Sequence, residues 1–197
     1  MRKRKIFFII ISVIIQISFS ANVSSTLSFE QKYSLAEYIE IFKPYAIKEM
    51  NRTGVPASIT MAQAVIESSF GNSELALNAN NHFGIKNKPD WTGQIYYYSK
   101  DKCYYKKYNS IVESYEDHSN HLKSRKWYDD LFKLKITDYK SWAHGLKKAG
   151  YAVDPIYAEK LIKIIEKYNF SSFDYYYISA DSTFADQQKQ QKQAPSL

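Results

Sequence analysis

Glu67 is the residue of this sequence best placed to do acid–base chemistry. It stands near the C-terminal end of an apolar segment with helical spacing, four residues after Gln63 and next to Ile66. Partial burial disfavours a charged carboxylate, and the negative end of a helix dipole disfavours it further. A carboxylic acid that stays protonated near neutral pH can protonate a leaving-group oxygen, which is the step that a glycosidase needs. From its position alone, a solvated residue at a helix end is the alternative.

The other reactive side chains form no complete site in the sequence. His118 and His121 are close enough to share a metal ion, but no third His and no Cys accompanies them. We therefore expect no metal and no cofactor. The chain has no phosphate-binding glycine loop and no HExxH zinc motif. The single cysteine, Cys103, cannot form an internal disulfide, and we expect it to act as a small apolar filler.

The segments around Glu67 resemble a known family. Residues 62–76, Ala-Gln-Ala-Val-Ile-Glu-Ser-Ser-Phe-Gly-Asn-Ser-Glu-Leu-Ala, resemble the catalytic segment of glycoside hydrolase family 73, the bacterial glucosaminidases. Three more segments match in order: residues 80–86 with 91–93 resemble the loop into the family's β-lobe, 108–118 the helix after it, and 149–161 the closing motif. Four motifs in the same order, covering about residues 34–169, argue against chance similarity.

The resemblance implies a peptidoglycan hydrolase that cuts the β-1,4 bond after N-acetylglucosamine in glycan strands, with Glu67 as general acid. It implies a mainly α (α+β), lysozyme-like domain in which a small β-hairpin lobe flanks a glycan groove. Tyr157 would be the family's active-site tyrosine, with a core tyrosine at helical spacing from Leu161 as the alternative. The residues expected to line the groove are Asn80, Asn81, His82, Phe83, Trp91 and Tyr151. Trp91 could instead anchor the hairpin.

The sequence departs from the family at the second carboxylate, which many members carry in the β-lobe to activate water. Here residues 94–103 contain one acid, Asp101. Glycosidases usually use two carboxyl groups, about 5 Å apart for retention and up to roughly 9 Å apart for inversion. Asp101 is therefore a candidate catalytic base, or a turn residue between Lys100 and Lys102. If Asp101 is only structural, the acetamido group of the substrate could assist instead.

Two other functions stay open at this point. A lytic transglycosylase uses one catalytic glutamate and adds no water, which would suit the loss of a clear second carboxylate. A non-catalytic peptidoglycan-binding or assembly protein would keep the groove without turnover. Retention of both Glu67 and Tyr157 argues against the second alternative, because a protein that only binds glycan has no chemical need for a desolvated acid beside a tyrosine.

The elements that must position these residues are mostly helical, since the long periodic segments repeat at helical spacing and the chain has only six glycines and five prolines. Pro44 should kink or divide the first helix, and Gly71 should cap the second. Residues 91–108, rich in tyrosine around a polar centre, predict a β-hairpin or a small irregular lobe. The predicted helices span residues 35–54, 56–71, 110–123, 138–150 and 154–168.

The first twenty residues have the order of a secretory signal peptide. Arg2 to Lys5 are positive, residues 6–17 are apolar apart from Ser12 and Gln16, and small residues follow at Ser18 and Ser20. We expect a signal peptide at residues 1–20, with an uncleaved anchor as the alternative. The mature protein would then be secreted, either periplasmic or associated with the cell wall, with no stable membrane anchor.

Charge and length limit the remaining possibilities. The signal segment holds four of the formal charges that give the chain its net +7, and the other lysines are spread along the sequence, so we expect no nucleic-acid partner. About 150 residues can bury one hydrophobic core. We expect a monomer whose catalytic domain spans residues 28–172. Residues 173–197, with their Gln/Lys tract, are expected to form a polar, disordered tail.

Overall fold

The structure is a computed structural model and describes residues 33–177. The predicted signal peptide and the Gln/Lys tract lie outside the described residues. Within them, the helices and strands follow one another as α1 (Leu35–Thr53), α2 (Ala57–Ser68), α3 (Glu74–Ala79), β1 (Ile95–Tyr98), β2 (Cys103–Lys106), α4 (Ile111–Lys123), the 3-10 helix η1 (Lys126–Lys133), α5 (Tyr139–Lys148), α6 (Tyr157–Lys167) and the 3-10 helix η2 (Phe170–Tyr176). The mainly α fold with a small hairpin, as predicted from the sequence, is confirmed.

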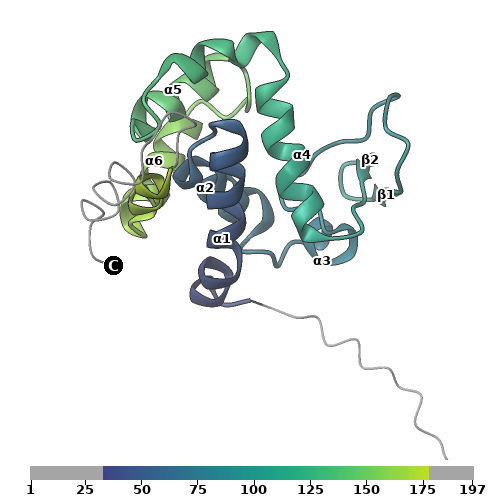
Figure 1. Ribbon diagram of the computed structural model, residues 1–197. Helices are drawn as coiled ribbons and strands as arrows, with labels where there is room; N and C mark the ends of the chain where they lie inside the picture. The colour runs from purple at the N-terminus through teal and green to yellow at the C-terminus, as the bar shows by residue number, and fades with distance from the viewer. Residues whose placement is uncertain (1–32, 178–197) are drawn as a thin grey trace, which may run out of the picture.

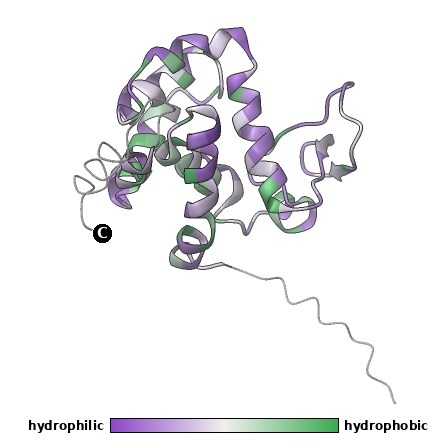
Figure 2. Ribbon diagram, in the orientation of Figure 1, coloured by the Kyte–Doolittle hydropathy of each residue, from purple (hydrophilic) through white to green (hydrophobic). Residues whose placement is uncertain are grey.

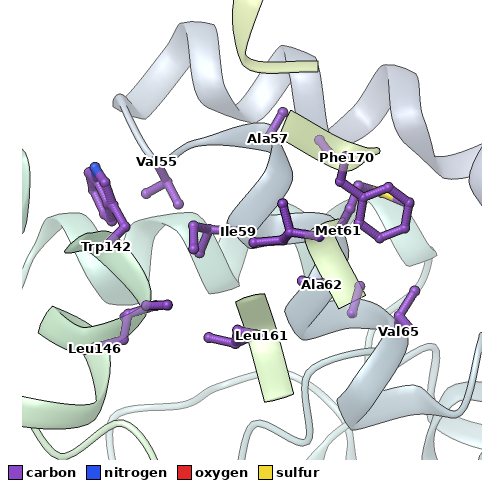
Figure 3. Close-up of a cluster of buried hydrophobic side chains, with 14 of the residues drawn as sticks. Val55, Ala57, Ile59, Met61, Ala62, Val65, Trp142, Leu146, Leu161 and Phe170 are labelled. Atoms are coloured by element: carbon purple, nitrogen blue, oxygen red, sulfur yellow. The ribbon is translucent and has the colours of Figure 1, made fainter. Parts of the chain in front are cut away.

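Helix α2 forms the centre of the core. Ten of its twelve residues are buried, because α1, α5, α6 and η2 all pack against it. Apolar side chains from these neighbours meet those of α2, and Trp142, Leu146, Leu161 and Phe170 surround Ile59 and Met61 (Figure 3). A helix that is buried on all sides needs no polar face, which explains its run of small and apolar residues. The catalytic candidate Glu67 lies in the last turn of this central helix.

The hairpin forms a lobe at one side of the helices. In Figure 1 strands β1 and β2 lie at the right, beyond α3 and α4, whereas α5 and α6 lie at the left. The strands pair antiparallel, with Ile95 opposite Lys106 and Tyr98 opposite Cys103. Hydrophilic residues run along α4, which lies between the lobe and the rest of the domain (Figure 2). The predicted hairpin is therefore present, as a two-stranded ribbon.

Two predicted helix features need correction. Of the two effects predicted for Pro44, a kink or a division of the helix, the division is wrong, because α1 runs unbroken from Leu35 to Thr53. The second helix ends before Gly71, because Ser69 and Phe70 already adopt positive φ angles of 50° and 59°. Gly71 continues this left-handed run at φ 75°, and a Cβ there would lie 2.8 Å from the Tyr38 ring. Glycine is therefore required at this position, directly after the end of the helix that carries Glu67.

The predicted domain boundary at residue 172 also needs correction. Residues 173–176 continue the 3-10 helix η2, and Phe173 and Asp174 are buried. Asp174 accepts hydrogen bonds from the backbone N–H of Ser58 at 2.8 Å and from its hydroxyl at 2.6 Å. It thereby caps the first turn of α2, where Pro56 offers no side-chain cap. The end of η2 thus belongs to the folded domain.

Candidate active site

A cavity of about 570 Å³ opens beside the C-terminal end of α2. Its walls come from that helix end, from the segment 83–88 before the hairpin, from α4, from the segment 151–154 and from α6. Of the predicted site residues, Glu67, Phe83, Tyr151 and Tyr157 line it. Four residues from separate parts of the sequence therefore meet at one site.

Glu67 is one of the titratable groups in the wall of this cavity. The Tyr157 hydroxyl donates a hydrogen bond to its Oε1 at 3.2 Å. Burial raises the pKa of Glu67 above its usual range, and the Tyr157 hydrogen bond opposes that shift only in part. The structure therefore holds a carboxyl group in an environment that favours its neutral, proton-donating form. Tyr157 is buried and also contacts Glu67. The two interpretations of this residue, a core tyrosine and a tyrosine of the active site, are therefore compatible.

A chain of buried hydrogen bonds leads from Glu67 into the core. The Gln63 side-chain nitrogen donates to the Tyr157 hydroxyl oxygen at 3.1 Å, and the Gln63 carbonyl oxygen lies 3.0 Å from His118 Nε2. Since a carbonyl oxygen only accepts, His118 must donate from Nε2. Burial lowers the pKa of His118 to about 3, so its ring is neutral and carries its one proton on that nitrogen. Each of the three hydrogen bonds, from His118 to Gln63, from Gln63 to Tyr157 and from Tyr157 to Glu67, is therefore donated in the direction of Glu67.

Aromatic rings form the walls on either side of this chain. The Phe83 ring stacks on the His118 ring with centroids 4.0 Å apart, and Tyr151 stacks on Tyr157 at 5.6 Å. Lys147 donates hydrogen bonds to the backbone oxygens of Ala152 and Val153 and so fixes the segment that carries Tyr151. Ring faces of this kind can pack on the apolar faces of sugars.

Asn81 and His82 do not line the cavity, contrary to the prediction. Both side chains are fully buried, and Asn81 binds the backbone of Ile85 and Lys106 through three hydrogen bonds of 2.8 to 3.0 Å. His82 Nδ1 lies 2.7 Å from the Tyr38 hydroxyl in the core. Buried polar groups are held by partners inside the protein, so these two residues fix the loop rather than contact a ligand.

Asn80 and Trp91 also lie away from the cavity lining. Asn80 ends α3 at φ 51° and donates to the backbone oxygen of Tyr108 at 3.0 Å. The Trp91 indole N–H donates to the Gln94 backbone oxygen at 2.9 Å, and Lys106 Nζ lies 4.4 Å from the indole ring. These contacts match the alternative considered for Trp91, that of an anchor for the hairpin.

Asp101 lies in the hairpin turn and is not among the residues that line the cavity. It accepts hydrogen bonds from the Tyr105 hydroxyl and from the Cys103 backbone N–H, the latter at 3.1 Å. Lys86 Nζ lies 3.8 Å from its carboxylate. These contacts are those of a residue that shapes the turn.

Besides Glu67, the cavity wall contains one more acid, Asp154. Lys160 Nζ binds its carboxylate at 2.5 Å, and this contact lowers the pKa of Asp154.

The two histidines weighed as metal ligands have other contacts. His118 is committed to Gln63 through Nε2, and the His121 ring packs against Tyr128 at 6.1 Å. In the described part of the chain, residues 33–177, no cluster of three His, Cys, Asp or Glu side chains could hold a metal ion. In the same residues, no helix has both the length and the apolar character needed to cross a bilayer.

A family model places the chain among known proteins. The model named Glucosaminidase, described as mannosyl-glycoprotein endo-beta-N-acetylglucosaminidase, matches residues 43–170, which is more than half of the chain. The chain belongs to the glucosaminidase family. The match begins in α1 and ends at the start of η2, so it contains all the residues that line the cavity.

Curated relatives of this chain come from several bacteria. Exo-glucosaminidase LytG of Bacillus subtilis (strain 168) is 37% identical over 130 residues, which cover 59% of this chain and 45% of that protein. Peptidoglycan hydrolase FlgJ of Vibrio parahaemolyticus is 28% identical over 163 residues, or 75% of this chain and 52% of that protein. The chain spans about half the length of these relatives.

Solved structures share the fold of this chain. The glycoside hydrolase domain of Salmonella typhimurium FlgJ matches with a TM-score of 0.60 and 26% identity, covering 70% of this chain and 89% of that one. The catalytic domain of the autolysin Auto from Listeria monocytogenes matches with a TM-score of 0.58 and 27% identity, covering 73% and 91%. The lysozyme-like fold expected from the sequence is therefore confirmed.

Several residues in or next to the cavity wall were not predicted from the sequence. Gln63 stands one helical turn before Glu67, and that spacing could have identified it as a neighbour on the same face. His118 was considered only as a metal ligand, and its contact with Gln63 joins residues 55 positions apart. Lys86 and Lys88 also line the cavity. Lys86 ends the segment 80–86 that the family resemblance marked as a loop, and Lys88 lies between that segment and residues 91–93.

Proposed function

We propose that this glucosaminidase hydrolyses the β-1,4 bond after N-acetylglucosamine in the glycan strands of peptidoglycan. The names of its relatives support this substrate, since they include a glucosaminidase and peptidoglycan hydrolases. We also propose that residues 1–20 direct export and that the mature protein acts as a monomer on the cell wall, without a nucleic-acid partner or a cofactor. The catalytic domain in this proposal runs from about residue 28 to residue 177, because η2 packs on α2.

The observation that carries the proposal is the environment of Glu67. Its carboxyl group lines the cavity, burial raises its pKa, and the Tyr157 hydroxyl donates to Oε1. In the proposed reaction Glu67 gives its proton to the glycosidic oxygen as the bond to the anomeric carbon breaks. Phe83, Tyr151 and Tyr157 supply the walls against which the sugar lies. A protein that only binds glycan would have no use for the buried acid.

The second chemical group in this proposal is the substrate's own acetamido group. Asp101 is held by the hairpin turn, and Asp154 is neutralised by Lys160. Neither acid is therefore free to act on a water molecule beside Glu67. The acetamido oxygen would attack the anomeric carbon as the glycosidic bond breaks, forming a cyclic oxazolinium intermediate. Glu67, now a carboxylate, would then take a proton from the water that opens this intermediate.

The same arrangement favours a lytic transglycosylase as the second candidate, because such an enzyme also works with one glutamate. Mass spectrometry of reduced peptidoglycan fragments after digestion separates the possibilities. Fragments ending in reduced N-acetylglucosamine would support the proposed glucosaminidase. Anhydro-muramic ends would identify a transglycosylase, and binding without new ends would contradict both.

A further inference from the structure

The cavity beside Glu67 continues into a second one along α4. This second cavity has a volume of about 150 Å³ and shares Ile85, Lys88 and His121 with the first. Its far wall contains Arg125, just beyond the end of α4, together with Lys106 from β2. The two cavities are therefore adjacent, and we refer to them together as the groove, whose second part contains a group of cationic side chains. The proposed function assigns no role to this cationic end.

The charges at this end are unequally paired. Lys106 binds Asp117 at 2.9 Å, and the Tyr108 hydroxyl donates to the same carboxylate oxygen at 2.6 Å. Lys88 and Arg125 have no acid within 4.0 Å among residues 33–177. Both cations therefore lack an acidic partner, although the Arg125 guanidinium lies 5.2 Å from the Trp127 ring centroid. The one other acid in the wall, Asp90, is exposed.

His121 lies where the two cavities meet and responds to the same cations. Its pKa is lowered to about 4, first by burial and then by Arg125 and Lys88, whereas Asp117 opposes that shift. The ring is therefore neutral near neutral pH, and it adds no positive charge to this end of the groove. A negative group bound between Lys88 and Arg125 would offset their effect and raise the pKa of His121.

We propose that Lys88 and Arg125 bind a carboxylate of the peptide that peptidoglycan carries on the lactyl group of muramic acid. This inference rests on the proposed function, because it assigns the cationic end of the groove to a substituent of the strand bound at Glu67. A strand lying along α4 would bring its own side branch to this end. A polyphosphate would be another anionic ligand for these cations, but it would be repelled by the nearby Asp90 and Asp117. A peptide carries positive as well as negative groups and can therefore pair with both the cations and the acids.

The test compares two substrates for each protein: glycan strands with peptides, and the same strands after an amidase has removed them. For the wild type, we expect kcat/KM to be higher on strands with peptides. In Lys88→Ala and Arg125→Ala this preference should fall about three- to tenfold, mainly through KM, as expected for a lost charge-assisted contact that is partly exposed. Lys126→Ala, next to Arg125 but outside both cavity walls, should keep the wild-type preference.

A wild type without any preference, or an Arg125→Ala variant that loses activity equally on both substrates, would overturn the inference. Cleavage of peptide-free strands by the wild type tests the proposed function separately. A binding experiment tests recognition of the peptide separately from the proposed cleavage activity, even if no cleavage occurs. In Glu67→Gln protein, a soluble disaccharide carrying a peptide should raise the pKa of His121 in an NMR titration, and the disaccharide alone should not. An unchanged His121 titration with the peptide-bearing ligand would contradict the inference.

Discussion

Gln63 and Tyr157 are joined by a hydrogen bond of 3.1 Å in which the amide nitrogen donates to the phenol oxygen. A phenol has one proton, so that of Tyr157 is left to point at Glu67, 3.2 Å away. His118 holds the Gln63 amide in this orientation by donating to its carbonyl oxygen. A glutamine that lies outside the cavity lining therefore determines how the tyrosine presents its proton to the acid.

Replacing Gln63 with Met tests this positioning role, because Met keeps the volume but cannot donate to Tyr157. We expect kcat to fall about tenfold, the usual scale for one weakened hydrogen bond to a reacting group. The Tyr157 hydroxyl would also stabilise the Glu67 carboxylate less, so the basic limb of the kcat–pH profile should move upward. Met61→Leu, buried in the same helix, is the control. A loss of kcat with an unmoved basic limb would indicate a purely structural role for Gln63.

Glu67→Gln should abolish peptidoglycan cleavage, with a loss of at least about 10³-fold in kcat. The amide has nearly the shape of the acid but no proton to give. The variant should be at least as stable as the wild type at pH 7, because the raised pKa of Glu67 means that ionising this carboxyl disfavours folding. Clearing of purified cell walls and thermal melting measure the two effects. Wall clearing at the wild-type rate would remove Glu67 from the mechanism.

Activity should decline with rising pH along a limb above the ordinary glutamate pKa of about 4.3, because in the proposed reaction Glu67 must be protonated and burial raises its pKa. Tyr157→Phe removes the hydrogen bond that opposes this shift, so its basic limb should lie higher still while kcat falls. Tyr151→Phe is the matched control, since it keeps the ring beside Tyr157. Profiles of kcat against pH for the three proteins decide the point, and a wild-type limb near pH 4.3 would argue against a raised acid.

Asp101→Asn should keep most of the activity, within about threefold of the wild type, if the substrate's acetamido group assists the reaction. The asparagine can still accept from the Cys103 backbone N–H, so the turn should persist. The rate of release of reducing ends measures the effect. A loss of 100-fold or more would instead identify Asp101 as the catalytic base and would imply that the hairpin moves toward the cavity when glycan binds.

Asp174→Asn should change how stability depends on pH. Burial raises the pKa of Asp174 to about 7, against about 3.9 for an unfolded aspartate. Its contribution to stability is therefore full below about pH 4 and is lost as the pH rises through 7. The asparagine can still accept from the Ser58 N–H and can donate to the Ser58 hydroxyl. The variant's Tm should thus rise relative to the wild type by several degrees between pH 4 and pH 7. Parallel Tm curves for the two proteins would contradict this assignment.

The parts of the fold that could be predicted from the sequence are those with a regular local signal. The helix predicted at residues 110–123 is present as α4 (Ile111–Lys123), and the Ser110 side chain caps it by accepting from the Glu113 N–H. The hairpin followed from its clustered tyrosines. The 3-10 helix η2 was missed because it is a short segment without the 3.6-residue repeat, and its stability comes from packing on α2.

The site was only partly predictable for a related reason. Glu67, Phe83, Tyr151 and Tyr157 were identified through motifs, and they meet in the cavity. Asn81 and His82 belong to the same motifs but are buried, and a motif does not separate residues that hold a loop from those that contact a ligand. The contacts of Gln63 with Tyr157 and His118 join positions 94 and 55 residues apart, and no local pattern encodes them.

The cap that Asp174 places on α2 also affects the order in which the domain can be completed. The two hydrogen bonds to Ser58 span 116 positions of the chain. A ribosome makes Ser58 and Glu67 early and Asp174 last among the three. While the chain is still growing, the helix that carries Glu67 lacks the carboxylate that accepts from the Ser58 N–H, and this cap can form only after η2 has been made. Any process that acts on the nascent chain before residue 174 is made therefore acts on a protein whose central helix α2 still lacks this cap.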